Sequence, residues 1–196
     1  MRAAIAIESQ QQIFTEARTY RAWLDKPVSD EQLHAMFDLA QWGPTSVNSQ
    51  PMRTVFVKSR EGKEKLMPAV MESNRSKVLA ASATAIIAYD EKFYEDLPTL
   101  FTAYDAKALF VGQDLLIQET AFRNSSLQGA YLMIAVRALG LDVGPISGFN
   151  NAKVDEAFFE GTSWKSNFIC NIGHGDESKL YPRGPRRSFD QVCRIV

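Results

Sequence analysis

The stretch Thr84-Ala-Ile-Ile-Ala-Tyr89 is a nearly continuous apolar run of the length of a β-strand. A strand that is apolar on both faces is usually covered on both faces, in the middle of a sheet. We therefore expect residues 84–89 to form a central strand, flanked by elements from either side of it in the chain.

The residues before this run predict a second strand and two short helices. The pattern TVFVK at 54–58 is rich in strand-forming residues. Helices are expected at 62–66 and at 74–81, and the second one places Asn74 and Lys77 one turn apart on one face.

Two further helices are predicted nearer the N-terminus. Residues 5–17 carry an apolar stripe of Ile7, Ile13 and Phe14. The sequence SDEQ at 29–32 is a capping box that begins an amphipathic helix. The expected buried face of that helix has helical spacing and consists of Leu33, Met36, Phe37 and Ala40, closed by Trp42.

The residues after the central strand predict an aromatic segment and a long helix. Residues 90–112 are irregular and suit a lid or partner-facing segment, with core filling under a long loop as the alternative. Residues 113–139 predict a helix that ends at Gly140, a left-handed cap. At 1.5 Å per residue it would be about 40 Å long, so we expect a second molecule to cover part of it.

The last third of the chain predicts two more strands, a helix and a tail. Strands are expected at 142–143 and 168–172, with Asn150 capping a helix that runs to Phe159. Residues 176–196 are interpreted as a C-terminal arm. Strands separated by helices of unequal length favour one α+β domain over residues 1–196.

Composition limits the function. The chain has 196 residues, 45% of them hydrophobic, and a net charge of -1, which argues against capture of nucleic acid or of an anionic membrane. No apolar run suits a signal peptide or a membrane span. Cys170 and Cys193 are expected to be reduced thiols, so we expect a cytoplasmic protein.

Several catalytic and binding motifs are absent from the sequence. There is no GxGxxG after a strand, no GxxxxGK[ST] and no GxSxG, which argues against a dinucleotide fold, a P-loop and a serine hydrolase. His34 and His174 are the only histidines, so no metal site is expected. A bound cofactor that performs the chemistry itself fits this inventory.

Four polar clusters are candidate cofactor ligands. The loop GPTSVNSQP at 43–51 is dense in hydrogen-bonding groups between a helix and a strand. Arg18, Thr19 and Arg21 suit a phosphate or a planar ring edge, with a solvated charged turn as the alternative. The other two clusters are 74–77 and the basic tail at 179–187.

Taken in order, these segments resemble the FMN-dependent nitroreductase family over essentially the whole chain. The matching motifs are ARTYRAW, GPTSVNSQP, NRSK at 74–77 and GPISGF at 144–149, followed by the basic tail. Within the family the chain is similar to the short RutE/HadB-like subgroup. WGPTS, ETAFRNSS, ALGLDVGPISGF and KLYPRGPRRSF carry that likeness.

The resemblance implies a nitroreductase-like α+β fold, with a largely antiparallel sheet covered by helices, in an intertwined homodimer. It implies FMN as cofactor, NADH or NADPH as hydride donor, and ping-pong hydride transfer through flavin N5. The FMN ligands that it implies are Arg18, Thr19, Arg21, Asn74, Lys77, Pro145, Ile146, Ser147, Gly148, Arg183 and Arg186, with Pro44, Thr45, Ser46 and Asn48 from the other subunit.

The implied reaction is reduction of malonic semialdehyde to 3-hydroxypropanoate or of a similar small aldehyde. Arg123, Phe93 and Tyr104 are candidate substrate contacts. The alternatives are a broad reductase of nitroaromatics, quinones or halophenols, a flavin-binding protein without turnover, and a scaffold without cofactor. Ser147 stands where many relatives carry Glu, so its contribution to nicotinamide binding stays open, as does the choice between NADH and NADPH.

Overall fold

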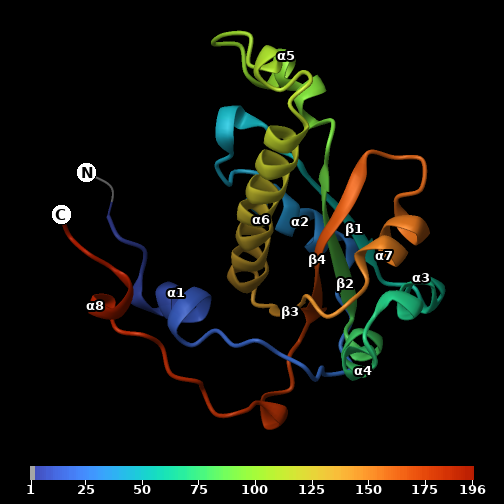
Figure 1. The fold of residues 1–196 in the computed structure, drawn as a ribbon. Coiled ribbons are helices and arrows are strands. Elements are labelled where there is room, and N and C mark those ends of the chain that lie inside the picture. The colour runs from blue at the N-terminus through green and yellow to red at the C-terminus, as the bar shows by residue number, and fades with distance from the viewer. Residues whose placement is uncertain (1–2) are drawn as a thin grey trace.

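The computed structural model describes residues 3–196 and contains an antiparallel four-stranded sheet covered by helices (Figure 1). The strand order is β1-β2-β4-β3, and every neighbouring pair is antiparallel. The strands are β1 (Met52–Val57), β2 (Ala83–Asp90), β3 (Asp142–Ile146) and β4 (Trp164–Gly173). The helices are α1 (Ile7–Gln10), α2 (Asp30–Ala40), α3 (Arg60–Leu66), α4 (Glu72–Ala80), α5 (Leu97–Leu100), α6 (Asp114–Ala138), α7 (Asn151–Phe158) and α8 (Phe189–Val192).

Strand β2 is central, as its apolar sequence predicts. All eight of its residues are buried, and it pairs with β1 on one side and β4 on the other. Ala85 and Ile87 point toward α2 and α6, whereas Ile86 and Ala88 point toward the opposite layer of helices. The expected α+β architecture is therefore confirmed.

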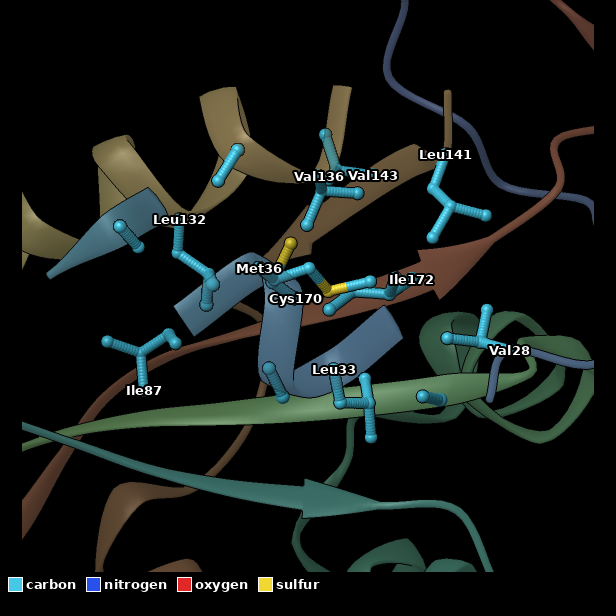
Figure 2. Close-up of a cluster of buried hydrophobic side chains, with 14 residues drawn as sticks. Val28, Leu33, Met36, Ile87, Leu132, Val136, Leu141, Val143, Cys170 and Ile172 are labelled. Carbon is cyan, nitrogen blue, oxygen red and sulfur yellow. The ribbon is translucent and has the colours of Figure 1, made fainter. Parts of the chain in front are cut away.

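The first layer packs α2 and α6 against the sheet. Figure 2 shows Met36 of α2 close to Cys170 of β4, with Leu132 and Val136 of α6 above them. Ser29 and Gln32 form the predicted capping box, with reciprocal bonds of 3.2 and 3.0 Å. The predicted buried face of α2 is correct for Leu33, Met36 and Ala40 but wrong for Phe37 and for Trp42 after the helix, which are exposed.

The second layer packs α3, α4 and α7 against the other face of the sheet. Leu66, Val78 and Val154 are its fully buried side chains from these three helices. The Asn150 side chain accepts a hydrogen bond from the Lys153 N–H at 3.1 Å, which confirms the predicted cap. Gly140 follows α6 with a φ of 73°, so the left-handed cap is confirmed as well.

The first predicted helix differs from its sequence pattern. Helix α1 changes after Gln10 into a π-helical segment, Gln11–Thr15, and the helix ends before Ala17. None of these residues is buried in the protomer, and the side chains of Ile7 and Phe14 are more than half exposed. The apolar stripe is therefore present but does not pack into the core of its own chain.

The aromatic segment between β2 and α6 builds a third, smaller core. Phe93, Leu97 and Phe110 are buried there with Ile117 and Ala121 of α6. Two 3₁₀ turns, Phe93–Glu95 and Lys107–Leu109, flank α5.

The C-terminal arm leaves the sheet after β4 and runs past the N-terminal segment, so that the described N-terminal segment and the tail lie on one side of the molecule (Figure 1). Its residues from Tyr181 onward are all exposed. Among residues 3–196, no helix is both long and apolar enough to cross a membrane.

Candidate functional site

Two adjoining cavities share Thr19 and Arg21 in their walls. The larger has a volume of about 580 Å³ and the smaller of about 270 Å³. The larger lies between the N-terminal segment, the end of α6 and the tail. The smaller is lined by Thr19, Tyr20, Arg21, Asn74, Lys77 and residues 144–148, which are the end of β3 and the two residues after it.

The N-terminal segment is held against β3 by backbone bonds. Thr19 forms a parallel bridge with Val143, and the Tyr20 N–H donates to the Val143 carbonyl at 2.9 Å. A Cβ on Gly144 would lie 2.3 Å from the Tyr20 carbonyl oxygen, so no larger residue fits. This close approach brings Thr19 and Arg21 beside the end of β3 and the two residues that follow it, Ser147 and Gly148.

Helix α4 contributes the polar pair that its sequence predicts. The Lys77 ammonium donates to the Asn74 side-chain oxygen at 2.8 Å, and the Asn74 amide donates to the Gly148 carbonyl at 3.2 Å. A Cβ on Gly148 would lie 2.5 Å from the Asn74 amide nitrogen. Trp23 fixes the same helix, because its indole N–H donates to the Lys77 carbonyl at 3.2 Å.

The tail forms the remaining wall of the larger cavity. Arg18 donates to the Tyr181 carbonyl at 2.5 Å, and Arg21 donates from Nε to the Lys179 carbonyl at 3.1 Å. Arg183 reaches back to the Ala17 carbonyl at 3.3 Å. The arginines of both segments therefore tie the tail to the N-terminal segment.

The larger cavity is strongly cationic. Its lining contains Arg18, Arg21, Arg137, Lys179, Arg183 and Arg186. Among the described residues, no carboxylate lines it. Guanidinium groups favour phosphate and other planar or multidentate anions, so this arrangement suits an anionic ligand.

Sequence analysis did not single out Arg137. It lies in the last turn of α6, where a basic residue is ordinary; its position in the cavity depends on the docking of the N-terminal segment. One of its terminal nitrogens donates to the Ile13 carbonyl at 3.2 Å, and its buried Nε has no hydrogen-bond partner among residues 3–196. No local sequence signal distinguishes it from a surface arginine.

Burial raises the pKa of two groups at the smaller cavity, Asp142 of β3 and Tyr20, which lines it. Burial raises the pKa of Asp142, although the carboxylate accepts the Gly175 N–H at 2.9 Å, which acts in the opposite direction. Burial also raises the pKa of Tyr20, with the Asp142 charge adding to the effect. The bond from the Gly175 N–H to Asp142 and the bond from the Tyr20 N–H to the Val143 carbonyl both hold β3, which lines the smaller cavity.

The loop that includes Pro44, Thr45, Ser46 and Asn48 lines neither cavity of the protomer. The Ser46 N–H donates to the Asn124 side chain at 2.8 Å, and the Asn48 amide donates to the Leu100 carbonyl at 2.9 Å. The loop therefore packs against α5 and the middle of α6. Val47 has a φ of 47°, a left-handed backbone that is rare for a β-branched residue.

The candidate substrate contacts also lie outside the two cavities. Phe93 has no exposed surface, so in this structure its side chain is core and cannot touch a substrate. Tyr104 is 55% exposed. Arg123 is exposed and forms an ion pair with Glu119, one turn away on α6.

A third cavity of about 660 Å³ lies between α2 and β1. Its walls include Phe37, Met52, Phe56 and Trp164, together with Arg53, whose guanidinium pairs with Asp90 at 2.8 Å. This cavity contains none of the site residues predicted from the sequence.

Comparisons with known proteins agree with the fold and the motifs. Residues 15–174 match the model of the nitroreductase family. A Burkholderia lata protein, provisionally named NADH dehydrogenase/NAD(P)H nitroreductase, is 56% identical over 184 residues, which is 94% of each chain.

Two solved structures share the fold. An Exiguobacterium sibiricum nitroreductase in complex with FMN is 23% identical with a TM-score of 0.84, over 100% of this chain and 99% of the other. A Staphylococcus epidermidis structure assigned as an NAD(P)H:FMN oxidoreductase is 22% identical with a TM-score of 0.80, over 100% of each chain. By its matched residues and its close relative, this chain belongs to the nitroreductase family.

Proposed function

We propose that the two adjoining cavities bind FMN and that the protein is an NAD(P)H-dependent FMN oxidoreductase. The observation that carries the proposal is the junction at Thr19 and Arg21, where a cationic cavity adjoins the cavity lined by the end of β3 and by Ser147 and Gly148. The FMN complex of the Exiguobacterium protein and the names of the relatives support the same assignment.

The residues present fit this cofactor. The cationic set in the larger cavity suits a phosphate, with Arg18, Arg21, Arg183 and Arg186 as its ligands. The smaller cavity suits a flat ring, because its wall is backbone at Gly144 and Gly148, where a Cβ would collide with neighbours.

The chain's own residues would orient the ring and balance its charge. Asn74 is fixed by Gly148 and Lys77, so its amide is positioned before any ligand binds. The Lys77 ammonium would favour a negative charge on the part of the ring beside it. Pro145, Ile146 and Ser147 would border the ring by main-chain groups, so Ser147 in place of Glu leaves binding intact. Bound FMN would supply hydride transfer between NAD(P)H and an acceptor.

We further infer that the working form is a homodimer in which Pro44, Thr45, Ser46 and Asn48 close the partner's site. The apolar side chains that α6 leaves at the surface support this inference, since large exposed apolar patches mark interaction sites. They are Leu115 (83% exposed), Leu116, Phe122, Leu127 and Tyr131.

For the acceptor, we propose a small aldehyde such as malonic semialdehyde, on the likeness to the RutE/HadB-like subgroup. Arg123 would hold its carboxylate only after leaving Glu119, and Tyr104 would be available at the surface. The second candidate is a nitroaromatic or quinone, which the names of the relatives favour.

We also propose that the protein works in the cytoplasm. Cys170 and Cys193 are both free thiols, as is usual in a reducing compartment.

The visible absorption spectrum of the protein and its steady-state rates of turnover together test the proposal. Purified protein should be yellow, and anaerobic NADH or NADPH should bleach it. Steady-state rates with malonic semialdehyde and with a nitroaromatic then separate the two acceptors, and a large preference for the nitroaromatic would remove the aldehyde assignment. Protein that is colourless and does not take up added FMN would refute the proposal as a whole.

A further inference from the structure

The tail and the N-terminal segment are joined by an antiparallel series of contacts. Going outward from the sheet, the Asp176 N–H meets the Ala22 carbonyl at 3.0 Å, Arg21 meets Lys179, Arg18 meets Tyr181, and Arg183 meets Ala17. Three of these four contacts use an arginine of the cationic cavity. The tail is thus held by the same side chains that would bind the anionic ligand.

Arg21 differs from the other arginines of this series because it lines both cavities. Its guanidinium carbon lies 3.2 Å from the centre of the Tyr181 ring, and its Nε donates to the Lys179 carbonyl. Within residues 3–196 its two terminal nitrogens form no hydrogen bond, so they remain available to an anion. Stacking on one face and a bond at Nε together fix the plane in which those nitrogens point.

Tyr181 does not hold the fold together. Its side chain belongs to none of the three hydrophobic clusters and is 65% exposed. Its hydroxyl makes no hydrogen bond with the part of the chain that the structure describes. Tyr181 lines the larger cavity itself, and the contact of its ring with Arg21 there distinguishes it from other exposed aromatic residues.

We propose that Tyr181 is a positioning residue that orients Arg21 toward the phosphate of the cofactor, an inference that rests on the proposed function. A cation–π contact fixes one arginine without competing for its donors, unlike a carboxylate partner. Because Arg21 lines both cavities, we assign the effect of Tyr181 to the anionic end of the ligand, and the experiment must separate that end from the ring. Riboflavin, which has the same ring and no phosphate, is the probe that separates these two ends.

The test compares Tyr181→Leu with Tyr181→Phe by titrating each apoprotein with FMN and with riboflavin. Tyr181→Leu removes the aromatic face, so its Kd for FMN should rise about 5- to 30-fold while its Kd for riboflavin stays at the wild-type value. Tyr181→Phe keeps the face and should bind FMN as the wild type does. Phe189→Leu, another exposed aromatic change in the tail, is the matched control and should change neither Kd.

The outcomes separate this inference from the proposed function. If the wild type does not bind FMN, the proposed function fails. If the wild type binds FMN and Tyr181→Leu binds it equally well, only the role of Tyr181 fails. An equal loss of FMN and riboflavin in Tyr181→Leu would also overturn that role, because the effect would not be directed at the phosphate.

Discussion

Arg18 connects the N-terminal segment, the tail and the cationic cavity by one side chain. Replacing it with Ala should weaken FMN binding by about 1.5–3 kcal/mol, the range for a hydrogen bond to a charged group. Arg194→Ala is the control, because Arg194 is an exposed arginine of the tail outside both cavities. Calorimetric titration measures both, and an unchanged FMN affinity in Arg18→Ala would remove Arg18 from the site.

The raised pKa of Asp142 predicts how the free energy of unfolding depends on pH. Because burial raises its pKa above the ordinary 3.8, the folded protein binds this proton more readily than the unfolded chain does. Its contribution to the free energy of unfolding therefore falls as pH rises from 3.8 through the raised value, and stays low at neutral pH. Asp142→Asn has no such titration, so its stability should not show this fall.

Denaturant midpoints across the acid range measure the effect. Asp142→Asn can still accept the Gly175 N–H, whereas Asp142→Ala leaves that donor unpaired and should be about 1 kcal/mol less stable than Asp142→Asn. If Asp142→Asn keeps the full wild-type dependence on pH, another group is responsible for it.

At the scale of elements, the contact between β3 and the N-terminal segment depends on the absence of a side chain. In Gly144→Ala the new methyl group would meet the Tyr20 carbonyl, which belongs to the backbone and cannot rotate away. The variant should be destabilised by about 1–3 kcal/mol, as for other overpacked sites. Gly184→Ala, whose Cβ would have no neighbour nearer than 3.9 Å, should unfold like the wild type in the same denaturant titration.

The elements also show what local sequence could and could not predict. The central strand, the Ser29 capping box, the Asn150 cap and the Gly140 cap were predictable, since each depends on residues close together in the chain. The π-helical segment at Gln11–Thr15 was not, because its apolar stripe gives the period of a helix and no information on what covers it.

The candidate site, too, has residues that the sequence could predict and residues that it could not. Polar clusters and the family resemblance predicted which segments would carry cofactor ligands, and the structure brings residues 18–21, 74–77 and 144–148 and the tail to two adjoining cavities. The contacts of Arg137 with Ile13 and of the Tyr181 ring with Arg21 could not be predicted, because each joins segments more than a hundred residues apart.

At the scale of the whole molecule, the exposed apolar surface of α6 predicts self-association. Leu127→Asp places a charge on that surface at a residue that is 48% exposed, so the protomer itself should fold. Light scattering after size exclusion should show the wild type as a dimer and the variant shifted toward the monomer.

Ala152→Asp is the control for this experiment, because it makes the same change in charge at an exposed position of α7, on the other side of the sheet. It should leave the mass unchanged. A wild type that is monomeric at all concentrations would contradict both the dimer and the proposed role of residues 44–48.

The contacts between the tail and the N-terminal segment have a practical consequence for handling the protein. The tail brings Lys179, Arg183 and Arg186 into the cavity proposed for the phosphate, whereas within residues 3–196 no residue after Arg186 lines it, so a purification handle joined after Val196 should leave cofactor binding intact. Trimming of the tail by a protease before Arg183 would remove Arg183 and Arg186 from that cavity, and it should cost the preparation its colour while the sheet and its helices stay folded. Fading on ageing would then be a sign of a clipped tail rather than of an unfolded enzyme.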